Sequence, residues 1–151
     1  MKYLILIVAL SPILAGCNSD REIEREILIS LDQAHMDFVQ SPAPSEKVKA
    51  LNRRVGILES SRTVGVPKER FIAGELCFTY LRIYVWESAQ GNYQAAREAL
   101  VKADEINRSH SLGVLKNIDL TDPIQAAFIT KSIQTLDEEL AKSFAKDPVV
   151  R

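Results

Sequence analysis

The segment from Pro67 to Gln90 restricts the fold more than any other part of the sequence. Its apolar residues follow one another so closely that little polar surface is left after Glu75. A helix that is apolar nearly all round has to be covered on several sides. We therefore predict a central helix with other helices packed around it. Its apolar residues are Phe71, Ile72, Leu76, Cys77, Phe78, Tyr80, Leu81, Ile83, Tyr84, Val85 and Trp86.

Apolar residues elsewhere also recur at helical spacing, and no alternating strand pattern lies between turn signals. The predicted fold is therefore all-α, a bundle of about five helices. The four further helices begin at cap or turn residues, prolines end the first and the last, and an irregular connection from Arg108 to Thr121 follows the one that starts at Asn92. They are predicted to start at Ser19 or Asp20, at Ser45, at Asn92 and at Asp122-Pro123, and the last is predicted to end at Asp147-Pro148.

Each of these four helices has one apolar face that is predicted to point inward. The inward residues are Ile23, Ile27, Leu31, Ala34 and Phe38; Val48, Leu51, Val55 and Leu58; Ala96, Ala99, Leu100, Ala103 and Ile106; and Ile129, Ile133, Leu136, Leu140 and Phe144. Lys47, Lys49, Arg53 and Arg54 are predicted on outer faces. Asp137, Glu138 and Glu139 are interpreted as part of a solvated face.

The first sixteen residues have the layout of a secretory signal peptide. Lys2 gives a basic start, an apolar run follows, and small residues precede Cys17. A membrane-spanning helix needs about 20 apolar residues, and this run is shorter and is followed by polar residues. The segment is therefore predicted to target the chain for export and to be removed. The alternative is an uncleaved hydrophobic helix with a buried cysteine.

The sequence Leu14-Ala15-Gly16-Cys17 resembles the lipobox of bacterial lipoproteins at all four positions. The resemblance implies cleavage after Gly16 and attachment of a diacylglyceryl group to the thiol of Cys17. It also implies acylation of the new amino terminus, and two or more acyl chains hold a soluble domain at a bilayer where one binds only marginally. Asn18 stands where an Asp would resemble an inner-membrane retention signal, which favours the outer membrane, facing the periplasm.

This resemblance sets the expected domain organisation. The chain divides into a signal peptide (1–16), a lipidated N-terminus with a short tether (17–19), a helical periplasmic domain (20–147) and a C-terminal tail (148–151). With Cys17 lipidated, Cys77 is the remaining cysteine and cannot form an intramolecular disulfide. It is interpreted as a small buried hydrophobe, with a reactive thiol or a bridge between chains as the alternatives.

A second resemblance covers about residues 80–108. The glycine turn at Gly91, followed by Tyr93, Ala96, Leu100, Ala103 and Ile106, resembles the second helix of a tetratricopeptide repeat. It implies a repeat-like helical hairpin in which small residues admit the neighbouring helix. Asn107-Arg108 replaces the proline of that family, and no second copy occurs 34 residues away, whereas a repeat array needs several copies.

Motifs for chemistry are weak in this sequence. His35 and His110 have no second strong metal ligand at short spacing, so no metal site and no cofactor are predicted. There is no phosphate-binding glycine loop, calcium loop or CxxC motif. The formal net charge is −1, so the sequence has no excess of basic residues that would indicate binding to nucleic acid. We therefore expect a protein that is not an enzyme; an enzyme would need His35 or His110 beside a carboxylate or serine in a cleft.

Aromatic residues near the end of the central helix are the candidate binding residues. Tyr80, Tyr84, Trp86 and Tyr93 could form a concave patch that holds a helix or extended segment of a partner. We expect a membrane-anchored module for protein interaction or assembly in the bacterial envelope, of the secretion, pilus or conjugation accessory type. The alternative is a helical binder of a small ligand or peptidoglycan fragment, with a pocket lined by Trp86 and the tyrosines.

Overall fold

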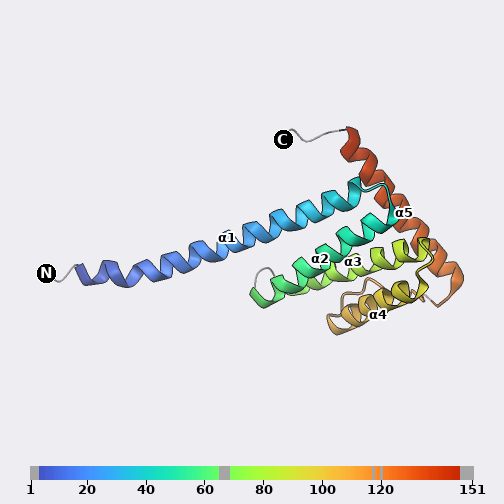
Figure 1. The fold of residues 1–151 in the computed structure, drawn as a ribbon. Helices are drawn as coiled ribbons and strands as arrows, with labels where there is room; N and C mark the ends of the chain where they lie inside the picture. Colours follow the sequence, from blue (N-terminus) through green and yellow to red (C-terminus); the bar gives the residue numbers. More distant parts are fainter. Residues whose placement is uncertain (1–3, 65–68, 117, 120, 147–151) are drawn as a thin grey trace.

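The computed structural model describes residues 4–64, 69–116, 118–119 and 121–146, with side chains for residues 22–61, 69–116, 118–119 and 121–142. The described chain contains five helices and no strand, which confirms the predicted all-α fold (Figure 1). The helices are α1 (Leu4–Gln40), α2 (Pro44–Val64), α3 (Glu69–Ala89), α4 (Tyr93–Ser109) and α5 (Pro123–Lys146).

Helices α1 to α4 form a layer in which each helix packs beside the next one in the chain and runs in the opposite direction (Figure 1). We call this unit the four-helix layer. Helix α5 crosses one end of the layer, where it packs against α1 and α3. The N-terminal half of α1 extends well beyond the other helices. No helix in the described part of the chain is long and apolar enough to cross a membrane.

The core lies between the neighbouring helices of the layer, and α3 is central to it as predicted. α3 packs against α2 on one side and α4 on the other. The four inward residues predicted on the second helix are all buried, and so are Leu31, Ala34 and Phe38 of α1. The coverage of α3 is incomplete, because Phe71 and Phe78 are each more than half exposed.

The turn between α3 and α4 is a glycine-based helix end. Gly91 has a φ of +79°, which an L side chain rarely adopts. The backbone N–H of Asn92 donates to the carbonyl of Glu87 at 3.0 Å, and that of Gly91 donates to Ser88 at 3.1 Å. This is the Schellman pattern, which satisfies the last carbonyls of a helix. It reverses the chain into the predicted helical hairpin.

Small residues bring the two helices of this hairpin close together. Ala96, Ala99 and Ala103 of α4 are buried, as predicted. The Cys77 side chain is fully buried, and its thiol donates to the carbonyl of Ala103 at 3.5 Å. Burial raises the pKa of the Cys77 thiol to about 11. The interpretation of this residue as a small buried hydrophobe is therefore confirmed.

Helix α1 begins at Leu4, so the prediction of a helix start at Ser19 or Asp20 was wrong for the intact chain. An N-cap is needed only where backbone N–H groups have no carbonyl one turn earlier. In the uncleaved chain the preceding residues supply those carbonyls. Gly16 and Cys17 lie within α1, and cleavage between them stays a prediction. The predicted linker at 65–67 and the tail at 148–151 lie outside the described residues.

Helix α5 begins as predicted, but its inward face differs from the predicted one. The Asp122 carboxylate accepts a hydrogen bond from the backbone N–H of Ile124 at 2.9 Å, with Pro123 in the first turn. Leu136, predicted to point inward, is half exposed, whereas Asp137 is 1 % exposed. The face that meets the layer runs through Ile133, Asp137 and Ala141 at steps of four.

Candidate functional site

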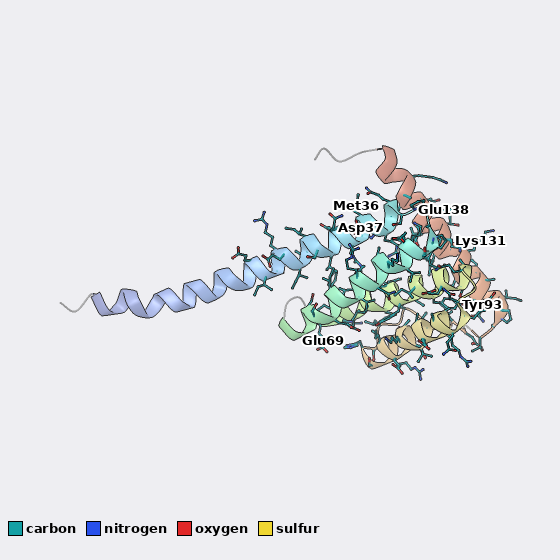
Figure 2. All side chains as sticks on the ribbon, in the orientation of Figure 1. Met36, Asp37, Glu69, Tyr93, Lys131 and Glu138 are labelled. Atoms are coloured by element: carbon teal, nitrogen blue, oxygen red, sulfur yellow. The ribbon has the colours of Figure 1, made fainter. Side chains whose placement is uncertain are left out.

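The four aromatic residues predicted as a binding patch do not share one surface. Successive helical residues are about 100° apart, so Trp86 points away from the side of α3 that carries Tyr80 and Tyr84. Tyr80 is buried and Tyr84 is half-buried against the core. Tyr93 begins α4 and is 74 % exposed (Figure 2). The structure therefore separates Trp86 and Tyr93 from the two inner tyrosines.

Tyr80 links three helices of the layer. Its hydroxyl donates to the Glu59 carboxylate of α2 at 3.2 Å, and the Lys102 ammonium of α4 lies 5.3 Å from the centre of its ring. Burial, followed by the nearby Glu59 charge, raises the pKa of Tyr80 to about 12. The residue is engaged in packing and hydrogen bonding within the layer.

Trp86 belongs to a different arrangement, where α3 meets α5. Its indole N–H donates to Oδ2 of Asp137 at 3.1 Å. The guanidinium Nε of Arg82, one turn earlier on α3, donates to Oδ1 of the same carboxylate at 2.9 Å. Both oxygens of Asp137 are thus bound by side chains that lie 51 and 55 residues away in the sequence. A buried carboxylate needs such partners because desolvation strongly disfavours its charge.

Lys47 of α2 completes this arrangement. Its ammonium donates to the carbonyl of Phe38 at 3.0 Å and lies 4.8 Å from the Phe38 ring centre and 5.1 Å from that of Trp86. The Arg82 guanidinium also lies 5.5 Å from the Phe38 ring centre. Burial lowers the pKa of Lys47, and the Asp137 carboxylate opposes that shift. We call these five residues, Asp137, Arg82, Trp86, Lys47 and Phe38, the Asp137 cluster.

The prediction that Lys47 lies on an outer face was wrong, since the residue is 8 % exposed. The physical reason is the end of α1. The last four carbonyls of a helix have no intrahelical partner, and a lysine side chain can bond to one of them. Phe38 supplies such a carbonyl, two residues before α1 ends at Gln40. Burial of Lys47 therefore satisfies a polar group that would otherwise lose its hydrogen bond to water.

The prediction for Arg54 also needs correction, because its side chain is largely buried. It donates to the carbonyl of Leu31 in α1 at 3.1 Å and pairs with the Glu75 carboxylate of α3. Arg54 thus joins α1, α2 and α3 through polar contacts. Arg53 is exposed as predicted and pairs with Asp37 at the C-terminal end of α1.

His35 lies half-buried at the edge of the Asp137 cluster, with its ring 6.4 Å from that of Phe38. Burial is the main cause that lowers its pKa below 6.5, and the positive charges of Arg54 and Arg82 act in the same direction. The carboxylates of Asp137 and Asp32 oppose the shift. Its neighbours Met36 and Asp37 lie at the end of α1 beside the part of α5 that carries Glu138 (Figure 2).

The other face of α5 points to solvent and is partly apolar. Ile124 is 79 % exposed, Phe128 is 69 % exposed and Leu136 is half exposed. A shallow hollow on this face is lined by Phe128, Lys131, Ser132, Thr135, Leu136 and Glu139. We call Ile124, Phe128 and Leu136 the outward face of α5. Large apolar residues that are exposed on one side of a helix can mark an interaction site.

The described residues contain no group of three or more His, Cys, Asp or Glu side chains placed to hold a metal ion. His110 ends α4, where its backbone N–H donates to the carbonyl of Ile106 at 3.1 Å. It lies far along the chain from His35. The side chains around Asp137 bind one carboxylate through the Arg82 guanidinium and the Trp86 indole N–H, with the Lys47 ammonium on the adjoining aromatic rings.

Sequence reasoning missed most of the Asp137 cluster. Asp137 stands beside Glu138 and Glu139, which is a pattern typical of a solvated face. Lys47 stands among other charged residues of the second helix, which favours the same interpretation. One signal was present: Asp137 continues a four-residue step from Ile133 and leads to Ala141. That spacing fits a carboxylate on the inward face.

In comparisons with known proteins, the chain matches no protein family, no curated protein and no solved structure.

Proposed function

We propose that this chain is a lipoprotein of the bacterial cell envelope, anchored through Cys17, whose helical domain is a module for protein interaction or assembly. The sequence Leu14-Ala15-Gly16-Cys17 supports the anchor. An anchored domain of this kind would face the periplasm from the outer membrane and serve a secretion, pilus or conjugation machine as an accessory.

The observation that carries the interaction role is the outward face of α5. Phe128 and Ile124 are large apolar side chains on a helix whose opposite face is already engaged by the layer. Aromatic residues are enriched at the centres of protein interfaces, because they bury a large area with few rotatable bonds. A partner that covers this face would remove both side chains from water.

The anchor is tested by substituting Cys17→Ser in the full-length chain and following incorporation of labelled fatty acid. We expect loss of the label and accumulation of unprocessed precursor. Cys77→Ser is the matched control and should retain both lipid and processing, because Cys77 is buried within the folded domain. A Cys17→Ser chain that is still processed and lipid-labelled would contradict the anchor.

The interaction role is tested by placing a photo-crosslinking amino acid at Phe128 of the anchored protein in its own envelope. The matched control is Asn52, an exposed polar residue of α2. We expect one defined protein adduct from Phe128 and none from Asn52. Adducts with lipid and abundant porins alone, or the same adducts from both positions, would overturn the proposal.

A further inference from the structure

Helix α5 is attached to the four-helix layer by a different kind of contact from those within the layer. Neighbouring helices of the layer share continuous apolar faces, whereas the contact face of α5 centres on a charged residue, Asp137. The apolar residues on either side of it, Ile133 and Ala141, are only partly buried. Among the described side chains of α5, Asp137 is thus the one that is buried against the layer.

The receiving groups all belong to the layer. Arg82 and Trp86 come from α3, Lys47 from α2 and Phe38 from α1. The Arg82 guanidinium binds the carboxylate directly, the Lys47 ammonium lies nearby on the Phe38 carbonyl, and the Phe38 ring lies within 5.5 Å of both cations. The surface is thus complementary in charge to a helix that presents one carboxylate between two apolar turns.

The chain between α4 and α5 sets how far α5 could move from the layer. Leu112, Val114 and Leu115 pack against the core and hold the first part of this connection. The residues after Leu115 and before Pro123 are seven, and such a segment can span about 23–25 Å when extended. This upper limit exceeds the width of a helix with its side chains, about 10–12 Å, so the length of the connection is compatible with release of α5.

We propose that the surface formed by Phe38, Lys47, Arg82 and Trp86 is a docking site for an amphipathic helix of a partner protein that carries one carboxylate between apolar turns, and that α5 occupies this site as a releasable latch. The observation behind it is that the site already binds a helix of this chemistry. This inference rests on the proposed interaction role and names the partner's chemistry; it does not depend on the lipid anchor.

The test uses the full-length protein in detergent and a fluorescent synthetic peptide of residues 123–146 as the probe. In the protein, Asp137→Asn removes the charge that holds α5, and Glu138→Gln is the matched control on an exposed neighbour. We expect the Asp137→Asn protein to bind the peptide at least tenfold more tightly than the wild-type or Glu138→Gln protein, because its own α5 competes less.

The peptide itself supplies the second comparison. A peptide carrying Asp137→Asn should bind on the order of 10- to 100-fold more weakly than the unchanged peptide, since a hydrogen bond to a charged group contributes about 1.5–3 kcal/mol. The ratio of the affinities of the two peptides should be smaller for the protein double variant Asp137→Asn and Trp86→Phe, because this variant lacks the indole N–H that donates to the carboxylate. Equal affinity for the two peptides would overturn the carboxylate site.

Three further outcomes also decide the question. Loss of all helical structure in the Asp137→Asn protein would overturn the latch, which requires the layer to stay folded alone. Wild-type dimers that the peptide dissociates would assign the site to a second copy instead of a partner protein. Failure of peptide binding together with a defined adduct at Phe128 would overturn the latch and leave the proposed interaction role standing.

Discussion

The four-helix layer and helix α5 belong to one chain but are held by different forces. The layer buries leucine, isoleucine, valine and alanine along three successive helix pairs. Helix α5 contacts the layer through one carboxylate and a short apolar strip, and its opposite face leaves Ile124 and Phe128 in water. Apolar burial is non-directional and grows with area, whereas a buried ion pair depends on a few atoms in one geometry. The layer should therefore tolerate small shifts that would release α5.

The largest expected effect comes from the core of the layer. Leu76→Ala removes a side chain that is 1 % exposed, and we expect it to lower the free energy of unfolding by about 2–5 kcal/mol. Leu136→Ala in α5 is the matched control and should change the free energy of unfolding by less than about 0.5 kcal/mol, because Leu136 is half exposed. Urea titrations of both variants measure the difference. Equal losses would mean that α5 is packed as tightly as the layer.

A smaller and local effect is expected from Asp137→Asn. The substitution weakens hydrogen bonds from Arg82 and Trp86 to a charged acceptor, each of which contributes about 1.5–3 kcal/mol. Trp86 is the single tryptophan of the chain, so its fluorescence reports this contact directly. We expect a shifted emission maximum with α3 still folded. Unchanged emission would show that the indole does not depend on the carboxylate.

The smallest expected effect is a pH dependence at His35. Its pKa is lowered in the folded chain, mainly by burial, so the unfolded chain binds a proton more readily as the pH falls through 6.5. Folding stability is therefore expected to decrease on acidification below about pH 6.5, and His35→Gln should reduce that decrease. Unfolding titrations at pH 7.5 and pH 5.5 measure the change in the free energy of unfolding between the two pH values, with His110→Gln as the control. An identical pH dependence in the wild type and in His35→Gln would contradict this role.

The helices of the layer could be predicted because their apolar residues recur at helical spacing. Val48, Leu51, Val55 and Leu58 are all buried where the spacing placed them, and the turn at Gly91 has the positive φ that a glycine permits. These are local signals. They depend on residues a few positions apart and not on which other helix lies opposite.

The Asp137 cluster could not be predicted because its signals are distant in the sequence. Asp137 is identified as buried only when Arg82 and Trp86 are known to face it, more than fifty residues earlier. Lys47 is identified as buried only when the end of α1 is known to place the carbonyl of Phe38 beside it. A charged residue on an amphipathic helix is ordinarily solvated, and the four-residue spacing of Asp137 from Ile133 does not outweigh that expectation.

The most direct test of the difference between the two regions is native-state hydrogen exchange of the wild-type chain at low concentrations of urea. Backbone amides of α5 and α3 are followed separately, since regions that open independently differ in their free energy of opening. We expect α5 amides to exchange through an opening of lower free energy and weaker urea dependence than α3 amides. Equal opening free energies and equal urea dependence in both helices would show a single cooperative unit and would contradict the independent release of α5 from the four-helix layer.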